Sequence, residues 1–265
     1  MHDGFKANEN LQKIIGDKFS GSTDLLVNLI SYFSDSPEDL KNTNLLEYLK
    51  NVFSPFQTIR DFLLRSEKYS SASKVEIAEF LRNEREHIFE EIISLFNKSR
   101  KIFQNKNQLT TISNSFFLRN FFILLNDEFG NVAVSVSESR PLFEGRILAK
   151  SLAEKNINVN LFTEAQTPEF VERCDAVVIG ADKILSDNSV VNKAGSRNLA
   201  IAAKYFNKPF YVLASKSKFS NSTDFDEGIH EKSEIFDDES NEMISVTNRY
   251  FEKIESSLIT AILHI

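Results

Sequence analysis

Four short polar segments contain the residues of this sequence that could bind or transform a small anionic ligand. They are residues 111–115, 138–141, 180–183 and 192–196. Each segment lies at the end of a predicted strand or directly before a predicted helix. Because parallel strands place ligands beyond their carboxyl ends, side chains from these segments should meet at one edge of a sheet.

The first segment, residues 111–115, has the sequence Thr-Ile-Ser-Asn-Ser and precedes a predicted helix. Ser113, Asn114 and Ser115 supply hydrogen-bond donors, and the N-terminus of a helix attracts negative charge. The same residue types form ordinary helix caps, which need no ligand. Both interpretations are open on the sequence alone.

Arg140 is the cation of the second segment, Glu-Ser-Arg-Pro. A guanidinium group binds a phosphate or a carboxylate through two parallel hydrogen bonds. The alternative is an ion pair within the loop, between Arg140 and either Glu138 or Glu144. The sequence does not choose between these two interpretations.

Asp182 ends the third segment's Gly-Ala-Asp motif, directly after the apolar run 176–179. An apolar strand would deliver this carboxylate to the sheet edge, where partial burial raises a carboxylate pKa toward the range of acid–base catalysis. An Asp that only fixes the loop or caps a helix is the alternative.

The fourth segment, Asn-Lys-Ala-Gly-Ser, precedes a predicted helix. Gly195 permits a tight backbone turn, so that free backbone amides, Asn192 and Lys193 should face the same space. The nucleotide-binding pattern Gly-x-x-x-x-Gly-Lys-Ser/Thr is missing, and no Gly-x-Gly-x-x-Gly follows a strand. A phosphate site is therefore predicted without the fingerprint of a P-loop enzyme or of a nicotinamide dehydrogenase.

Metal and cofactor chemistry have little support in this sequence. The histidines, His2, His87, His230 and His264, are scattered, and Cys174 has no partner at ligand spacing. No Gly-x-Ser-x-Gly motif marks a serine nucleophile. We expect no metal ion and no cofactor.

Composition bounds the protein class. The 265 residues are 42% hydrophobic, which is enough for a buried core, and the net charge of −7 argues against a direct nucleic-acid partner. A single cysteine favours a reducing compartment. The first six residues lack the apolar core of a signal peptide, and no stretch suits a membrane helix, so a cytoplasmic protein is expected.

Two regions of different periodicity must position the polar segments. Residues 1–104 have apolar side chains at three- and four-residue spacing, which predicts an all-helical bundle domain. Residues 105–265 alternate short apolar runs with helical stretches, which predicts an α/β fold with a parallel sheet, Rossmann-like in architecture. The predicted strands are 108–113, 131–137, 158–163, 175–180 and 209–213, and the helices are 116–126, 144–156, 168–173 and 196–206.

The end of the chain is predicted less sharply. Residues 215–242 are rich in Ser, Asp, Glu and Lys, which is typical of a solvated loop; a lid or a partner contact is the alternative. Ordered structure should return at 243–247, followed by a last helix over 252–263.

Several motifs in a fixed order resemble one family. They are Glu-Ser-Arg-Pro at 138–141, Gly-Ala-Asp at 180–182, Asn-Lys at 192–193, Pro-Phe-Tyr-Val at 209–212 and Asn-Arg-Tyr-Phe-Glu at 248–252. Together they resemble the regulatory alpha, beta and delta subunits of translation initiation factor 2B and the related isomerases of methylthioribose phosphate and ribose bisphosphate. The resemblance covers residues 108–265 closely and the preceding helices by architecture.

The resemblance implies a helical domain followed by a Rossmann-like domain, with a homodimer formed through the latter. The isomerases use a Cys in the first loop and the Asp of Gly-Ala-Asp, which correspond here to Ser113 and Asp182. A serine hydroxyl does not ionise near neutral pH without a base, and the regulatory subunits tend to carry Ser in this loop. Residues 19–22, Phe-Ser-Gly-Ser, replace an Arg-Gly-Ala phosphate contact of the isomerases.

The leading hypothesis is a regulatory, non-catalytic protein of the initiation factor 2B group that binds a sugar phosphate or a nucleoside monophosphate. Arg140, Lys193 and the helix start after Gly195 would hold phosphate, and Asp182 would meet sugar hydroxyls. The alternative is an aldose–ketose isomerase of a phosphorylated ribose-type sugar, with Asp182 moving protons. A structural subunit with an empty pocket is a third reading. Initiation-factor subunits are candidate partners. The binding residues would be Ser113, Asn114, Ser115, Arg140, Asp182, Asn192 and Lys193.

Overall fold

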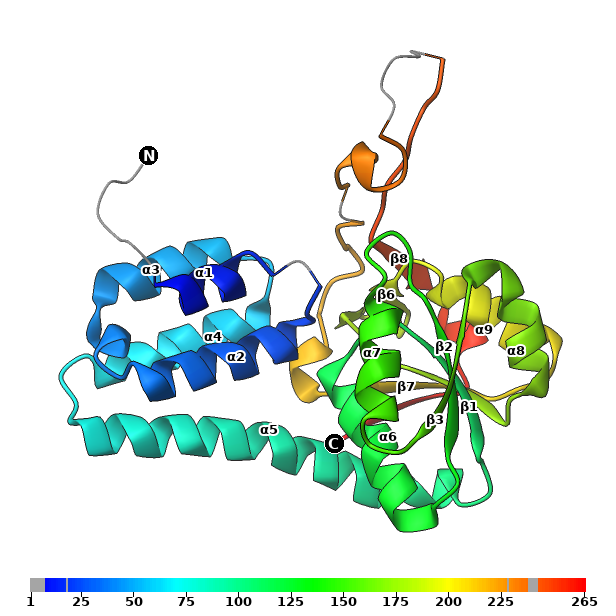
Figure 1. Cartoon of the computed structure of the whole chain (residues 1–265), viewed down its shortest axis with the longest axis horizontal. Helices are drawn as coiled ribbons and strands as arrows, with labels where there is room; N and C mark the ends of the chain where they lie inside the picture. The colour runs from blue at the N-terminus through cyan, green and yellow to red at the C-terminus, as the bar shows by residue number, and fades with distance from the viewer. Residues whose placement is uncertain (1–7, 18, 228, 238–242) are drawn as a thin grey trace. The chain divides into compact units, whose positions relative to one another are not determined.

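The computed structural model describes residues 8–17, 19–227, 229–237 and 243–265 (Figure 1). The chain divides into two compact units, Met1–Ile92 and Ile93–Ile265. The initial segment without an apolar stretch lies outside the described residues, as do residues 228 and 238–242 of the predicted polar loop. None of the described helices combines the length and the apolar character that a membrane span requires.

The N-terminal unit is helical, as the spacing of its apolar side chains predicts. On α2 the side chains of Leu29 and Phe33 are completely buried, and Phe62 of α4 stacks on Phe80 of α5 with ring centroids 5.9 Å apart. The helices are α1 (Glu9–Ile15), α2 (Ser22–Asp35), α3 (Thr43–Val52), α4 (Gln57–Ser66) and α5 (Lys74–Phe103), with 3-10 helices at Asp39–Lys41 and Glu67–Tyr69.

The long helix α5 belongs to both units. The division lies between Ile92 and Ile93, whereas the sequence suggested a boundary at residue 104, directly after this helix. The last turns of α5 pack into the second unit, where the ring of Phe103 meets Phe121 edge-on at 5.3 Å and Tyr211 at 5.4 Å. This helix is therefore a shared element.

The C-terminal unit is built around a six-stranded parallel sheet with the order β3-β2-β1-β4-β7-β9. All five predicted strands are confirmed within one or two residues. Strand β4 is buried along its whole length, which explains its continuous apolar run. The strands are β1 (Gln108–Ile112), β2 (Ala133–Ser137), β3 (Asn158–Phe162), β4 (Ala176–Ile179), β7 (Phe210–Ala214) and β9 (Ala261–His264).

Helices cover both faces of this sheet (Figure 1). Helix α6 packs with α7 on one face, and α8 packs with α9 on the other. The four predicted helices are confirmed, with ends that differ by up to three residues. They are α6 (Phe116–Phe129), α7 (Glu144–Ala153), α8 (Thr167–Arg173) and α9 (Ser196–Tyr205), and 3-10 helices lie at Glu164–Gln166, Lys216–Lys218, Lys232–Glu234 and Ser256–Leu258.

The predicted last helix over 252–263 is wrong. This stretch forms strand β8 (Phe251–Ile254), a 3-10 turn and strand β9. Thr260 shows why: its amide donates to the Phe210 carbonyl, and its hydroxyl accepts from the Phe210 amide, both at 2.9 Å. The segment that ends in β9 thus pairs with the otherwise free edge of β7. It is extended and contains β-branched residues, although its apolar spacing is also compatible with a helix. The expected order at 243–247 takes the form of a coil.

A second, three-stranded antiparallel sheet was not predicted. It consists of β5 (Lys183–Ile184), β6 (Val190–Lys193) and β8, in the order β5-β6-β8. Its strands have only two to four residues, too few to show a periodicity in the sequence. This small sheet carries Asn192 and Lys193, and it lies close to the ends of the main strands (Figure 1).

The strand order of the main sheet defines where a ligand should bind. From β1 the chain proceeds outward to β2 and β3, and it then returns to β4 on the other side of β1. In such sheets, the loops that follow the two strands at the reversal point run in opposite directions and leave a crevice between them. All four polar segments singled out above belong to loops or short strands at this end.

Candidate functional site

The loops after β1 and β2 are joined by a hydrogen bond, next to the reversal point between β1 and β4. Ser113 adopts the left-handed backbone conformation, with φ at 68°, and its amide donates to Oγ of Ser139 at 2.7 Å. Ser139 is completely buried and also left-handed, with φ at 65°. Two adjacent strands therefore end in one connected group of loops.

Ser115 and Asn114 serve the local structure of the first loop. Ser115 caps α6, since its Oγ accepts from the amide of Leu118 at 3.4 Å. Asn114 is buried, and its Oδ1 accepts from the guanidinium of Arg119 at 3.1 Å. The capping interpretation of this segment therefore holds for Ser115, while the hydroxyl of Ser113 has no bond to a histidine or carboxylate among the described residues.

Glu164 fixes the loop that follows β2. Its Oε1 accepts from the hydroxyl of Ser137 at 2.5 Å, from the amide of Ser139 at 2.6 Å and from the amide of Arg140 at 3.4 Å. One carboxylate thus gathers the end of a strand and the loop that carries Arg140. No local sequence signal marks Glu164, because it reaches this loop from the 3-10 helix after the neighbouring strand β3, more than twenty residues along the chain.

Arg140 is an exposed cation without an acidic partner in the described part of the chain. The two ion pairs considered for it are not formed, because Glu138 bonds Arg146 at 2.7 Å and Glu144 bonds Lys193. The Arg140 guanidinium instead lies 4.9 Å from the ring centre of Phe143. It is therefore available to an anion.

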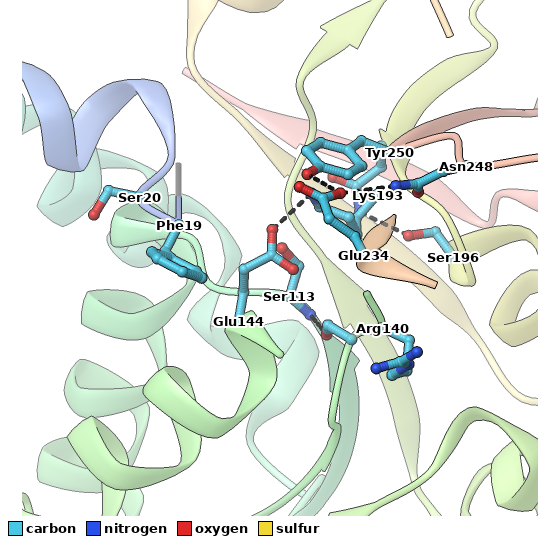
Figure 2. Close-up of polar contacts among 12 residues, drawn as sticks. Phe19, Ser20, Ser113, Arg140, Glu144, Lys193, Ser196, Glu234, Asn248 and Tyr250 are labelled. Carbon is cyan, nitrogen blue, oxygen red and sulfur yellow. Dashed lines mark hydrogen bonds and ion pairs between the residues drawn. The ribbon is translucent and has the colours of Figure 1, made fainter. Parts of the chain in front are cut away.

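Lys193 forms a buried ion pair with Glu144 (Figure 2). The Lys193 Nζ lies 2.6 Å from Oε1 of Glu144, and the two side chains are only 8% and 5% exposed. Burial raises the pKa of Glu144, while the charge and hydrogen bond of Lys193 lower it. The other carboxylate oxygen, Oε2, is buried and has no hydrogen-bond partner among the residues that the structure describes. Lys193 is thus compensated by an acid and is not a free phosphate ligand.

A close contact between α7 and β2 fixes Glu144. A Cβ atom added to Gly145 would lie 1.8 Å from the carbonyl oxygen of Ser137, so the helix touches the strand there. Phe143, which precedes the helix, has a left-handed backbone with φ at 60°. This turn directs Glu144 toward the small sheet. The sequence offered one signal, an acidic residue directly before a glycine at a helix start.

Two aromatic rings complete the surroundings of Lys193. Its ammonium lies 4.6 Å from the ring centre of Tyr250 and 5.1 Å from that of Phe251. Strand pairing explains the placement, because β8 runs beside β6 with Phe251 opposite Lys193, and the amide of Ala194 donates to the carbonyl of Tyr250. In the sequence, these two aromatic residues stand out only as part of the motif at 248–252.

Asp182 lies on the same rim as Lys193. Its amide donates to the carbonyl of Val191 at 2.9 Å, which ties it to the strand that carries Asn192 and Lys193. The expected partial burial of Asp182 is wrong, because its side chain is exposed. Its charge nevertheless affects two ionisable neighbours: it adds to the effect of burial in raising the pKa of Glu144, and it opposes the lowering of the pKa of the partly buried Lys218 by desolvation.

The helix start after Gly195 is already occupied. One carboxylate oxygen of Glu252 accepts from the amides of Gly195 and Arg197, both at 2.7 Å. The expectation that this N-terminus holds phosphate is therefore not met. Asn192, also assigned to the ligand, is buried, and its Nδ2 donates to Oγ of Ser196 at 2.8 Å.

Thiol and metal chemistry find no support in the described residues. Cys174 is buried, its Sγ donates to the carbonyl of Val171 at 3.2 Å, and burial raises its pKa. Within the described ranges, no group of three or more His, Cys, Asp and Glu side chains could hold a metal ion. In the described part of the chain, the groups at and beside the reversal point are instead the unpaired guanidinium of Arg140, the exposed carboxylate of Asp182, serine hydroxyls and a buried Lys–Glu pair.

Comparison with known proteins gives a family match over nearly the whole chain. The sequence model of the initiation factor 2 subunit family matches residues 6–263. Among curated proteins, ribose 1,5-bisphosphate isomerase of Archaeoglobus fulgidus is 40% identical over 96 residues, which are 36% of this chain and 31% of that protein. The alpha subunit of translation initiation factor eIF2B from Dictyostelium discoideum is 39% identical over 90 residues, 34% of this chain and 28% of the subunit. The match thus spans about a third of each curated relative.

Solved structures show the same fold. The 5-methylthioribose 1-phosphate isomerase of Pyrococcus horikoshii OT3 superposes with a TM-score of 0.77 at 18% identity, over 97% of this chain and 82% of the isomerase chain. A chain of the tetrameric eIF2B beta2-delta2 complex of C. thermophilum gives a TM-score of 0.65 at 18% identity, over 96% and 88% of the two chains. Both agree with helices followed by a parallel sheet.

Proposed function

Since the chain belongs to the initiation factor 2 subunit family, we propose that it binds a phosphorylated sugar or a nucleoside monophosphate and does not turn it over. The family contains both initiation-factor subunits and sugar-phosphate isomerases by name, so membership alone does not separate regulation from catalysis. The geometry of the candidate site favours binding.

The observation that carries the proposal is the guanidinium of Arg140, which follows β2, the strand beside the reversal point, and has no acidic partner among the described residues. Glu164 holds the backbone of Arg140 in place, while the acids nearest in sequence are engaged with Arg146 and Lys193. An arginine that is positioned but unpaired is suited to a phosphate, which it binds through two parallel hydrogen bonds.

The rest of the site offers partners for the sugar. Asp182 presents an exposed carboxylate, and Ser113 presents a hydroxyl, both good partners for ribose hydroxyl groups. The role of Lys193 changes from the one expected. Because Glu144 neutralises it, Lys193 acts as a structural cation beneath the site, and Arg140 is the main phosphate ligand.

The lack of an activated nucleophile supports binding without catalysis. At the position where the related isomerases carry Cys, this chain has Ser113, and no described base bonds its hydroxyl. The only thiol, that of Cys174, is buried in the core with a raised pKa. A serine without a base is a poor acid, base and nucleophile near neutral pH.

Isomerisation is the second candidate function, and the exposed carboxylate of Asp182 favours it. Asp182 stands at the Gly-Ala-Asp position used by the related isomerases, beside the buried Glu144–Lys193 pair. In this case Asp182 would move a proton between the first two carbons of a phosphorylated ribose-type sugar, and Ser113 would only bind.

Titration with ribose 5-phosphate, AMP and unphosphorylated ribose separates these proposals. A ligand at 100 times its Kd should stabilise the protein by about 2.7 kcal/mol, which appears as a rise in Tm. We expect stabilisation by one of the phosphorylated compounds and none by ribose. Arg140→Ala should abolish the rise, whereas Arg173→Gln, which removes a surface ion pair with Glu169 on α8, should leave it intact.

An assay for ketose formation decides between binding and catalysis. Bound ribose phosphate that stays an aldose supports the regulatory proposal. Turnover that disappears in Asp182→Asn would replace it with the isomerase, and the lack of any phosphate-dependent stabilisation would leave a structural subunit.

Partners and location are also proposals. A solved relative forms a tetrameric complex of beta and delta subunits, which supports an assembly with initiation-factor subunits. We propose a homodimer through the C-terminal unit as the simplest assembly, and a cytoplasmic location. Light scattering coupled to size-exclusion chromatography tests the dimer directly.

A further inference from the structure

One residue of the polar segment after β7, Glu234, lies beside the candidate site. Glu234 lies in the 3-10 helix Lys232–Glu234, and its Oε2 accepts from the hydroxyl of Tyr250 at 2.5 Å and from Nδ2 of Asn248 at 2.7 Å. Figure 2 shows Glu234 beside Tyr250, with Lys193 close to the same ring. Glu234 therefore contacts the ring that faces the buried ammonium.

Other contacts hold the same segment against β8 and the residues before it. The imidazole of His230 stacks on the ring of Tyr250 with centroids 3.4 Å apart, and the amide of His230 donates to the carbonyl of Asn248 at 3.1 Å. Nδ2 of Asn248 also donates to the carbonyl of Glu231 at 2.8 Å. Tyr250 is thus held from one side by residues 230–234 and faces Lys193 with its ring.

The chemistry of this arrangement links Glu234 to Lys193. A phenol that donates its proton to a carboxylate gains electron density in its ring, and a denser ring attracts a cation more strongly. The carboxylate also fixes the orientation of the ring, which decides whether its face or its edge meets the ammonium. Burial and the Glu234 hydrogen bond both raise the pKa of Tyr250, so the phenol keeps this proton.

We propose that Glu234 is a positioning residue for Lys193, acting through Tyr250, and that residues 230–234 form a wall behind the ligand site. The segment is then part of the binding machinery and differs from a freely solvated loop. Its effect on a ligand rests on the proposed function, but its effect on Lys193 does not.

Amine labelling measures the proposed positioning without any ligand. In the folded protein, acetic anhydride should modify the nearly buried Lys193 slowly, which mass spectrometry of its peptide can follow. Glu234→Ala removes two hydrogen bonds, and loss of even one of ordinary strength corresponds to about a fivefold change in an opening equilibrium. We expect Lys193 to be labelled about fivefold faster, with exposed Lys204 unchanged as the internal reference.

Three further variants make the result specific. Glu231→Gln is the matched control, because Glu231 lies in the same segment but contributes only its backbone carbonyl to Asn248. Tyr250→Phe keeps the ring and loses the hydroxyl, so it should behave like Glu234→Ala. Glu234→Gln keeps an acceptor oxygen and should restore a rate close to that of the wild type.

The outcomes separate this inference from the proposed function. If Glu234→Ala and Tyr250→Phe remain folded by circular dichroism and label Lys193 at the wild-type rate, the positioning role is excluded, whether or not ribose 5-phosphate binds. Faster labelling without any binding of ribose 5-phosphate supports the positioning role and removes only the sugar-phosphate ligand. Should Glu234→Ala unfold, Tyr250→Phe carries the test, with Glu231→Gln and Glu234→Gln as the variants expected to label at the wild-type rate.

Discussion

At the scale of single residues, the buried pair of Glu144 and Lys193 controls the charge of the candidate site. Each side chain is almost fully removed from solvent, and within the described residues neither has another ion-pair partner. Removing one partner of a buried pair costs about 3–5 kcal/mol, because a charge is left without compensation. The free energy of unfolding of variants at Glu144 and Lys193 therefore reports on whether the two residues are paired.

Lys193→Met should destabilise the protein in a pH-dependent way. Burial raises the pKa of Glu144 above its ordinary value of 4.5, and Lys193 opposes that rise, so its loss raises the pKa further. A carboxyl group whose pKa is higher in the folded than in the unfolded state stabilises the protein at pH values below its unfolded-state pKa. This stabilisation is lost as the pH rises through its folded-state pKa. The deficit of the variant in free energy of unfolding should therefore grow between about pH 5 and pH 8, as urea titrations can measure.

The double variant Glu144→Gln/Lys193→Met provides the control. It lacks the titrating carboxylate, so its difference from the wild type should change much less with pH. A deficit of Lys193→Met that is constant across this range would contradict the assignment of Glu144 as the buried acid.

Single residues were also the scale at which the sequence was most ambiguous. It predicted Arg140 and Lys193 as phosphate ligands at the sheet edge, but the carboxylates that neutralise or position them, Glu144 and Glu164, depend on contacts between distant loops. Asp182 was expected to be partly buried and is exposed. Composition of a loop predicts which groups are present, and only the fold decides how they pair.

At the scale of elements, α7 and the end of β2 lie so close together that there is no room for a side chain at Gly145. Gly145→Ala should destabilise the protein by about 1–3 kcal/mol, because the new methyl group has to displace the backbone of Ser137. Alanine normally stabilises a helix relative to glycine by about 0.5–1 kcal/mol, so the predicted sign is opposite to the helix propensity. Chemical denaturation measures the difference.

The matched control for this contact lies on the same helix. Ser151→Ala also raises helix propensity, but it adds no atom because serine already carries a Cβ, so it should be neutral or slightly stabilising. A Gly145→Ala variant as stable as Ser151→Ala would show that α7 can move away from β2 without cost.

The sequence predicted elements well where a local pattern determined them. Strand β4 and helix α9 each bury a continuous or periodic apolar face, and both were predicted within one or two residues. The small sheet of β5, β6 and β8 was missed because its strands are short, and β9 was taken for helix because its pairing with β7 overrides local preference. In both cases the strands form because they pair with residues distant in the sequence, which a local pattern does not reveal.

At the scale of the whole molecule, one continuous helix joins the two compact units. Helix α5 spans Lys74–Phe103, and the division falls inside it. A proline within a helix removes a hydrogen bond and clashes with the preceding turn, which costs about 3 kcal/mol. Asn97→Pro places this break on the exposed side of α5, close to the division.

We expect Asn97→Pro to separate the unfolding of the two units. In the wild type, the helix should transmit unfolding from one unit to the other, so that calorimetry records a single transition. The variant should show two transitions, whereas Asn97→Ala, which favours the helix, should keep one. A single transition in the proline variant, shifted only in Tm, would mean that the units are coupled by contacts other than α5.

The carboxylate of Glu252 links the time course of folding to the topology of the chain. It satisfies the first amides of α9 from a position 57 residues beyond Gly195, and it reaches them because β8 pairs with β6. Local helical turns form far faster than contacts that close such a long loop. The start of α9 should therefore stay frayed until the small sheet assembles, and Glu252→Gln should accelerate unfolding more than it slows refolding. In stopped-flow experiments, a loss of stability expressed mainly in the refolding rate would instead place the β6–β8 pairing early.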